Sequence, residues 1–237
     1  MWYMRYTTPM LVSILMPAYN AAPFIREAVQ SCLDQTYPLF ELIISNDGST
    51  DNTLDILNQI KDPRIIVLNN PHGGYSAAFN RALAESCGDI VARMDADDLQ
   101  SPTRMEKSVD MLLENPDIPL TTCKMVGLLE DGTTFPYSNG KMDPHLYATT
   151  TDSGFPVNAS IVAYKEVYDK IGGFDESLIT AADGDWNFRA LRYFNEWGFI
   201  NEFLYTYRRH PAQMTQNFSS EGRAIHANSK KKFLDAF

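Results

Sequence analysis

Four short apolar runs in the first part of the chain each end in polar residues and are each followed by a stretch with helical spacing. Runs of this length, bounded by turn residues, are typical of buried parallel strands. Strands that alternate with helices indicate a doubly wound sheet with right-handed crossovers. The pattern therefore predicts an α/β fold with a mostly parallel sheet. The four predicted strands are Leu11–Met16, Glu41–Ser45, Arg64–Leu68 and Asp89–Met94.

Helix signals lie between these strands. Pro23 is tolerated in the first turn of a helix that opens near Asn20. Asp51 begins the cap of a second helix that runs to about Ile60, and a third, rich in alanine, spans Ser76–Ala84. The looser pattern of the second half predicts strands at Thr121–Leu129, Phe155–Ala163 and Phe203–Tyr207, and helices at Lys165–Ile171 and Asp183–Phe194.

Polar segments follow three of the predicted strands directly. They are Ala18–Asn20, Asp47–Ser49 and Asp95–Asp98. Ligands of doubly wound sheets bind at the carboxyl ends of the strands. Since these ends meet at one edge of the sheet, we expect the three segments to form one site.

Three of the four residues Asp95–Asp98 are carboxylates, and they repel one another unless a positive group neutralises them. Hard divalent cations such as Mg²⁺ and Mn²⁺ take oxygen ligands and bridge to substrate phosphates. The alternative is a helix N-terminus, where Asp is favoured by capping and by the helix dipole. The position directly after a buried strand favours the metal interpretation.

Two further carboxylates have a functional and a structural interpretation. Asp47, at the end of the second strand, could accept the N3–H of uracil, or it could bond its own backbone in a turn. Asp183 could remove the proton of an acceptor hydroxyl, or it could cap the helix that follows. Near the C-terminal end, Arg208 and His210 could meet a diphosphate or a metal, although an isolated basic run is usually solvated surface.

These motifs, in this order, resemble the inverting family-2 glycosyltransferases of GT-A fold. The resemblance runs from about Val12 to about Thr215. One such motif would be weak, whereas the ordered set is highly specific. The matching segments are Val12–Asn20, Asn46–Asp51, Gly73–Asn80, Met94–Asp98, Gly172–Leu178 and Tyr207–His210.

The resemblance implies a role for each matching residue. Asp183 is the expected catalytic base, and Asp97 with His210 is the expected site of Mn²⁺ or Mg²⁺. Ala18, Tyr19 and Asp47 would hold the nucleoside, and Asp95 would lie near the ribose. The full set of expected donor-binding residues is Pro17, Ala18, Tyr19, Asn20, Asp47, Asp95, Ala96 and Arg208.

The resemblance also implies an organisation and partners. A single GT-A domain would hold a nucleotide-sugar-binding half (11–115) and an acceptor-binding, catalytic half (116–218). It would lie between an N-terminal extension (1–10) and a C-terminal helix or tail (219–237). The donor would be a nucleoside-diphosphate sugar, with UDP favoured over other nucleotides, and the acceptor a glycan or lipid-linked glycan in polysaccharide or lipopolysaccharide synthesis. A homodimer contact through the tail stays open.

Two departures from the family pattern leave alternatives open. The Glu that usually precedes the catalytic Asp is Ala182 here, and the Arg that usually precedes the Asn of the glycine-rich helix is Phe79. Ala182 keeps a non-catalytic sugar-nucleotide or glycan-binding module in consideration. A sugar-nucleotide pyrophosphorylase is disfavoured, because the loop Pro17–Ala22 lacks the basic residues that such enzymes carry after their first strand.

Net charge and composition further narrow the class of protein to which the chain can belong. The net charge of −10 argues against a nucleic-acid partner, which normally requires a basic face. A hydrophobic fraction of 44% is ample for a folded core. Cys32, Cys87 and Cys123 show no metal spacing and are expected as reduced thiols of a cytoplasmic protein. Leu11–Met16 is too short to span a membrane, so any attachment to the inner face of the membrane would be peripheral.

Overall fold

The computed structural model describes residues 9–138, 158–178, 180–194, 196–213, 227–228 and 231. The predicted N-terminal extension (1–10) and C-terminal tail (219–237) lie almost entirely outside the described residues. Most of the donor and acceptor halves predicted from the sequence lies within the described residues.

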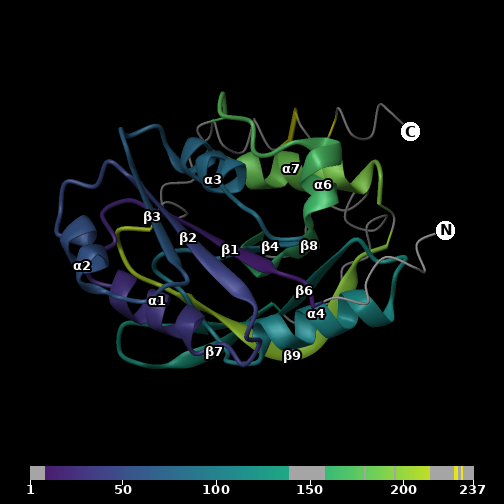
Figure 1. Cartoon of the computed structure of the whole chain (residues 1–237), viewed down its shortest axis with the longest axis horizontal. Helices are drawn as coiled ribbons and strands as arrows, with labels where there is room; N and C mark the ends of the chain where they lie inside the picture. Colours follow the sequence, from purple (N-terminus) through teal and green to yellow (C-terminus); the bar gives the residue numbers. More distant parts are fainter. Residues whose placement is uncertain are drawn as a thin grey trace.

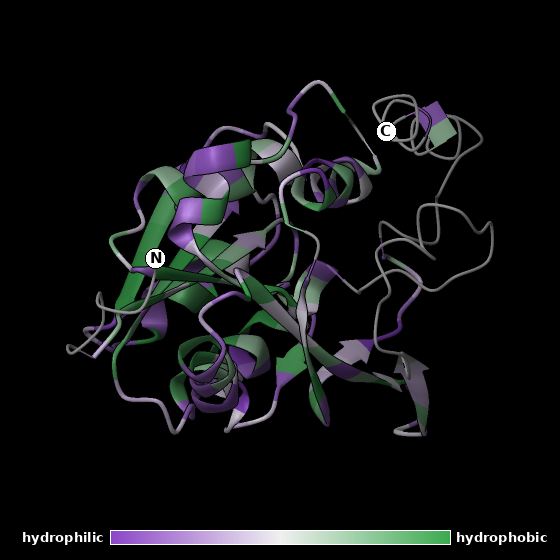
Figure 2. Ribbon diagram, turned by 90° about the vertical axis from the view of Figure 1, so that its right-hand side faces the viewer, coloured by the Kyte–Doolittle hydropathy of each residue, from purple (hydrophilic) through white to green (hydrophobic). Residues whose placement is uncertain are grey.

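One mixed sheet forms the centre of the described structure, with strand order β3-β2-β1-β4-β8-β6-β9-β5 and with β7 paired to β6 (Figure 1). Residues with strong β propensity and apolar side chains fill its central strands, which Figure 2 shows as largely hydrophobic. The strands are β1 (Val12–Ala18), β2 (Phe40–Asp47), β3 (Ile65–Asn70), β4 (Ile90–Arg93), β5 (Leu99–Gln100), β6 (Leu120–Leu128), β7 (Thr134–Ser138), β8 (Val162–Tyr164) and β9 (Gly198–Arg208).

The first four strands are parallel, in agreement with the prediction. Strands β2 and β1 end at Asp47 and Ala18, so the polar segments that follow start from the same edge of the sheet. The second half of the sheet adds antiparallel pairs, because β8 runs antiparallel to both β4 and β6. Strand β9 pairs parallel with β6 and antiparallel with the short β5, which brings the end of β9 back to the acidic segment.

Helices cover both faces of the sheet. In Figure 1, α3, α6 and α7 lie above the sheet and α1 and α4 lie below it, with α2 beside α1 at one end. A short 3₁₀ helix, η1 (Asn158–Ser160), precedes β8. The helices are α1 (Ile25–Leu33), α2 (Thr53–Gln59), α3 (Tyr75–Ala84), α4 (Arg104–Glu114), α6 (Lys165–Ile171) and α7 (Ala182–Leu191).

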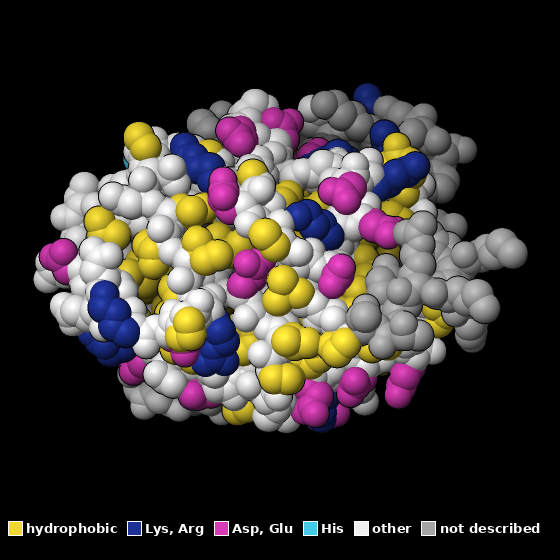
Figure 3. Space-filling model, in the orientation of Figure 1, with side chains coloured by type: hydrophobic (Ala, Val, Ile, Leu, Met, Phe, Trp, Pro, Cys, Tyr) yellow, Lys and Arg dark blue, Asp and Glu magenta, His cyan; other side chains and the backbone are white. Residues whose placement is uncertain are grey.

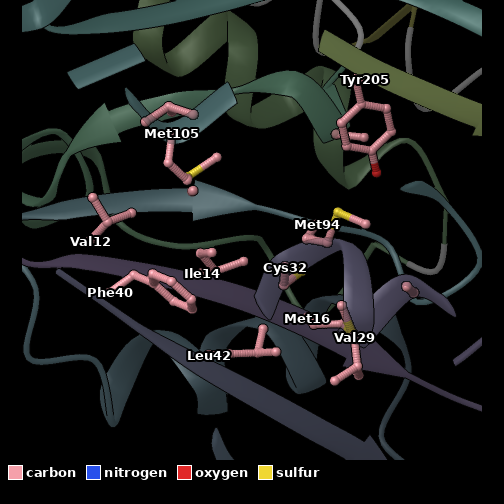
Figure 4. Packing of buried hydrophobic residues seen from close by; sticks show 14 of the residues in the cluster. Val12, Ile14, Met16, Val29, Cys32, Phe40, Leu42, Met94, Met105 and Tyr205 are labelled. Atoms are coloured by element: carbon pink, nitrogen blue, oxygen red, sulfur yellow. The ribbon is translucent and has the colours of Figure 1, made fainter. Parts of the chain in front are cut away.

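Successive side chains of β1 point to opposite faces of the sheet and enter two different hydrophobic clusters. Val12, Ile14 and Met16 enter the cluster beneath the sheet, which includes residues of α1 and α4 (Figure 4). Leu15 points to the opposite face and joins the cluster formed with α3, α6 and α7. Because successive side chains of a strand alternate between faces, one fully buried strand can support two helical layers.

Several predicted elements differ in their limits. The predicted strand Phe155–Ala163 begins outside the described residues, and its described part is η1 followed by β8. The carbonyl of Ala159 in η1 accepts a hydrogen bond from Arg104 instead of joining a strand ladder. The predicted helix Asp183–Phe194 is α7, which starts one residue earlier and ends at Leu191.

Helix α4 had no counterpart in the sequence prediction. Its buried residues include Met105, Val109 and Leu112, which lie at helical spacing, so a periodicity signal was present. No described helix combines the length and hydropathy that a membrane crossing needs. On the face drawn in Figure 3, the described acidic side chains are interspersed with lysines and arginines, which are not gathered into a basic area.

Candidate active site

The first two polar segments meet through hydrogen bonds at the end of β1. The backbone N–H of Asn20 donates to Ser49 Oγ at 3.0 Å, and Asn20 Oδ1 accepts the N–H of Thr50 at 2.8 Å. Asn20 holds a left-handed conformation with φ of 50°, which asparagine tolerates better than most residues. The neighbouring Tyr19 is 48% exposed, and its ring lies 4.3 Å from the ring of His72. An aromatic pair therefore lies beside the end of β1.

Asp47 is buried at the end of β2, next to His72 of this aromatic pair. Its two carboxylate oxygens accept the backbone N–H groups of Gly73 and Gly74, each at 2.8 Å. Arg81 Nη1 lies 3.1 Å from one oxygen, and His72 Nδ1 lies 2.8 Å from the other. Asp47 therefore fixes a distant loop, not its own turn. A uracil base that bonds to Asp47 would have to share or replace one of these hydrogen-bond donors, of which His72 is the most exposed.

The three acidic residues after β4 have different surroundings. Asp98 is fully buried, and its Oδ1 accepts the backbone N–H of Arg208 at 2.8 Å, which ties the acidic segment to the end of β9. Burial, followed by the charges of Asp95 and Asp97, raises the pKa of Asp98 well above its usual range. Asp97 is partly exposed, and its Oδ2 lies 3.0 Å from His210 Nε2.

Asp95 lies between two tyrosines. Tyr75 donates its hydroxyl to Asp95 Oδ1 at 3.1 Å, and the backbone N–H of Asp95 donates to the Tyr205 hydroxyl at 3.1 Å. Burial, then the charge of Asp97, and more weakly that of Asp183, raise the pKa of Asp95 to about 7. The charge of Asp183, on α7, thus also acts on Asp95.

His210 and Arg208 approach the acidic segment from the end of β9. The His210 ring packs against Phe24, with 4.3 Å between centroids, while its Nε2 faces Asp97. The Arg208 guanidinium pairs with Glu27 at 2.9 Å and lies 5.2 Å from the centre of the Phe24 ring. Its Nε is buried and has no hydrogen-bond partner in the part of the chain that the structure describes.

Asp183 is exposed in the first turn of α7. Its Oδ1 accepts the N–H of Gly184 at 2.8 Å, and its Oδ2 accepts Nδ2 of Asn158 at 2.9 Å. Ala181, the residue before the helix, has φ of 60°, an uncommon value for alanine. The N-cap position is therefore Ala181 and not Asp183, and the carboxylate is open to an incoming group.

The expected metal residues form a pair. Asp97 and His210, far apart in sequence, contact each other, while Asp95 and Asp98 are engaged by tyrosines and backbone. Among the described residues, no three His, Cys, Asp or Glu side chains gather into a metal-binding group. Mg²⁺ and related cations are commonly held by one or two protein ligands together with water and substrate phosphates. The pair fits that mode of binding, and a cation would relieve the repulsion by Asp97 that adds to burial in raising the pKa of Asp95.

The sequence analysis missed four residues of this region. Tyr75 and Tyr205 contact Asp95, and Arg93 and Asn158 lie behind Asp183. Arg93, an arginine inside an apolar run, was a signal that could have been noticed. Of the remaining donor-binding candidates, Pro17 and Ala18 end β1, and Ala96 is buried between Asp95 and Asp97.

Comparison with known proteins gives one family. Residues 13–171 match the family model described as glycosyl transferase family 2. The chondroitin synthase of Pasteurella multocida is 29% identical over 197 residues, which cover 82% of this chain and 20% of the synthase. The chain thus spans about a fifth of the length of that relative.

Solved structures share the fold. S. aureus TarS in complex with UDP-GlcNAc has a TM-score of 0.76 at 21% identity, covering 93% of this chain and 66% of TarS. The mannosyltransferase PcManGT of Pyrobaculum calidifontis, in complex with GDP-Man and Mn²⁺, has a TM-score of 0.69 at 20% identity, covering 94% of this chain and 64% of its own. Both likenesses extend over nearly the whole chain, which agrees with the predicted fold class.

Proposed function

The chain belongs to glycosyl transferase family 2, and from that premise we propose that it is a metal-dependent, inverting enzyme that transfers a sugar from UDP to a hydroxyl group of a glycan. Membership of this family supports glycosyltransferase activity. The nucleotide, the metal, the stereochemistry and the acceptor are the parts proposed here. Each rests on residues at the carboxyl edge of the sheet.

The contact between Asp97 and His210 carries the proposal. These two side chains lie 113 positions apart in sequence, yet Asp97 Oδ2 and His210 Nε2 are 3.0 Å apart. The partly exposed carboxylate of Asp97 and the buried imidazole of His210 offer the ligand types that Mn²⁺ and Mg²⁺ accept. A bound cation would stabilise the negative charge that develops on the leaving diphosphate. The fold shared with PcManGT, whose structure contains Mn²⁺, supports this choice of cofactor.

The donor would lie along the edge from β1 to β4. The proposed nucleoside residues, Tyr19 and Asp47, lie beside the loop that holds His72. The ribose would lie near Asp95, and the diphosphate near Ala96 and Arg208. UDP is favoured because TarS, with the same fold, binds UDP-GlcNAc, and because Asp47 could accept the N3–H of uracil.

Asp183 is the proposed base. Its carboxylate is exposed, and it interacts electrostatically with Asp95 near the proposed ribose position. In the proposed reaction, Asp183 takes the proton of the acceptor hydroxyl while the acceptor oxygen bonds to the anomeric carbon. The bond from that carbon to the UDP oxygen breaks in the same displacement. Attack from the face opposite the leaving group inverts the anomeric configuration.

The acceptor is proposed to be a glycan or a lipid-linked glycan in polysaccharide synthesis. The similarity to a chondroitin synthase supports a glycan acceptor. A lipid-linked acceptor would place the protein at the inner face of the membrane, in the cytoplasm. The half formed by 116–218 would bind this acceptor, and the half formed by 11–115 would bind the donor.

A non-catalytic sugar-nucleotide or glycan-binding module is the second candidate. Ala182 favours it, because this side chain is buried in the core cluster of α7, directly before Asp183. No carboxylate at this position can help to orient an acceptor. The two candidates differ in turnover and not in donor binding.

Release of UDP distinguishes them. We expect the wild-type chain to release UDP from at least one of UDP-glucose, UDP-galactose, UDP-GlcNAc and UDP-glucuronate with Mn²⁺, with water as the acceptor. EDTA should stop the release. Asp183→Asn should lower kcat by about 10²–10⁴-fold and leave the donor Kd unchanged. Donor binding without any release in the wild type would identify a binding module.

A further inference from the structure

Arg93 is a fully buried cation beneath the proposed site. It ends β4, two residues before Asp95, and its side chain lies among the aromatic residues of the α3, α6 and α7 layer. Its guanidinium carbon lies 4.0 Å from the centre of the Trp186 ring and 4.7 Å from that of Phe174, with Phe79 and Tyr168 farther away. Aromatic faces favour a cation at such distances.

The hydrogen bonds of Arg93 lead toward Asp183. Its Nε donates to the Tyr168 hydroxyl at 3.0 Å, and its Nη1 donates to Asn158 Oδ1 at 2.9 Å. Its Nη2 has no partner in the described part of the chain. No carboxylate among the described side chains forms an ion pair with Arg93. Asn158 is therefore the hydrogen-bonded side chain that links Arg93 to the exposed carboxylate of Asp183.

The hydrogen bond from Arg93 sets the orientation of the Asn158 amide. A guanidinium can only donate hydrogen bonds, so the amide oxygen of Asn158 must point to Arg93. The amide nitrogen is then directed to the opposite side, where it donates to Asp183 Oδ2 at 2.9 Å. The N–H of Gly184 holds the other oxygen, Oδ1. Both carboxylate oxygens of Asp183 are thus positioned, one of them by the buried cation.

We infer that Asn158 is a positioning residue that transmits the fixed orientation of Arg93 to the carboxylate of Asp183. The inference rests on the proposed role of Asp183 as the base. Arg93 and Asn158 act through Asp183 and not on the donor. The charge of Asp183 also acts on two titratable groups of the site, Asp95 and Tyr75.

Asn158→Asp separates positioning from simple structural support. The new carboxylate can still accept from Arg93 and adds an ion pair to a buried cation, so Tm should be equal to or higher than in the wild type. It cannot donate to Asp183 and instead places a negative charge against it. We expect kcat for UDP release to fall by about 10–100-fold while the donor KM stays within about twofold.

Asn158→Leu and Asn58→Asp complete the set. Asn158→Leu removes both hydrogen bonds without adding charge, so both Tm and kcat should fall. Asn58→Asp makes the same charge change on the exposed surface of α2 and should leave kcat and Tm unchanged. The assay is UDP release from the best donor of the panel above, at saturating Mn²⁺, with Tm measured on each purified chain.

The outcomes separate this inference from the proposed function. If Asp183→Asn is inactive but both Asn158 variants keep the wild-type kcat, the positioning role is wrong and the proposed function stands. If Asp183→Asn keeps the wild-type kcat, the base assignment fails and the inference fails with it. Loss of kcat in Asn158→Asp without loss of Tm or of donor binding is the result that supports it.

Discussion

At the scale of single residues, Arg93 shows how a charge is kept inside an apolar layer. Burying a guanidinium without partners would cost several kcal/mol. Here two hydrogen bonds, to Tyr168 and Asn158, and the faces of Trp186 and Phe174 offset part of that cost. The same positive charge lowers the pKa of the nearby Asp95, although burial and Asp97 outweigh it. Arg93 therefore acts both on the packing and on the field at the site.

Arg93→Lys should destabilise the chain by about 2–4 kcal/mol. Lysine keeps the charge but lacks the planar fork that reaches Tyr168 and Asn158 together, and its ammonium is more strongly hydrated. Urea unfolding monitored by circular dichroism measures the change. Arg26→Lys, at an exposed position of α1, should change the free energy of unfolding by less than about 0.5 kcal/mol. Equal effects of the two substitutions would show that the aromatic surroundings of Arg93 are unimportant.

Not every residue of the site could be predicted from the sequence. The resemblance to the family implied a shared role for Asp97 and His210, and the structure brings the two side chains together. Asn158 gave no signal, since its two partners lie 65 and 25 positions away and depend on how η1 packs. Side-chain partners across distant elements follow from the tertiary fold and not from a local pattern.

At the scale of elements, the turn after β2 depends on a close approach of two loops. Gly48 has φ of +68°, and an added Cβ would lie 2.7 Å from the backbone nitrogen of His72. The turn therefore brings Asp47 within reach of the Gly73-Gly74 backbone. Glycine is needed here both for its conformation and for its missing side chain.

Gly48→Ala should lower the free energy of unfolding by about 2–4 kcal/mol, because strain in the left-handed region adds to the clash with His72. Gly132→Ala is a matched control, since Gly132 has φ of +83° but no heavy atom within 4 Å of the added Cβ. It should cost only about 1–2 kcal/mol. Chemical denaturation of both variants gives the comparison, and equal losses would mean that the two loops can separate freely.

Element limits were predictable where the pattern was strong. The parallel strands β1 to β4 coincide with apolar runs, and the helix α6 ends at the predicted glycine pair, Gly172-Gly173. Helix α4 was missed, although its buried residues are regularly spaced. The antiparallel pairing of β8 was also missed, because its three residues carry too little periodicity to fix a direction.

At the scale of the whole molecule, one sheet joins two hydrophobic clusters. The cluster beneath the sheet includes Met105 of α4, and the cluster above it includes Trp186 and Trp197. Strand β1 contributes to both through Ile14 and Leu15. Because side chains of the same strands pack into both clusters, we expect the two clusters to unfold together in one cooperative transition.

Met105→Ala tests that coupling. Loss of this fully buried side chain should lower the free energy of unfolding by about 2–5 kcal/mol. Two of the three tryptophans, Trp186 and Trp197, belong to the opposite cluster. We expect the unfolding midpoint measured by tryptophan fluorescence to fall together with the midpoint measured by circular dichroism. An unchanged fluorescence midpoint would indicate that the two clusters unfold as separate units.

The central claim is that the carboxyl edge of the sheet binds a nucleoside diphosphate through a cation held by Asp97 and His210. Thermal unfolding with UDP, dTDP, GDP and CDP, each with and without Mn²⁺, tests this directly. A ligand at a hundredfold excess over Kd adds about 2.7 kcal/mol, or roughly 5–10 °C in Tm for a chain of this length.

We predict that UDP raises the Tm of the wild type only when Mn²⁺ is present and that Asp97→Ala removes this shift. Asp110→Ala, at an exposed position of α4, should keep it. The absence of a shift with every diphosphate, or an equal shift in Asp97→Ala, would contradict the account of the site.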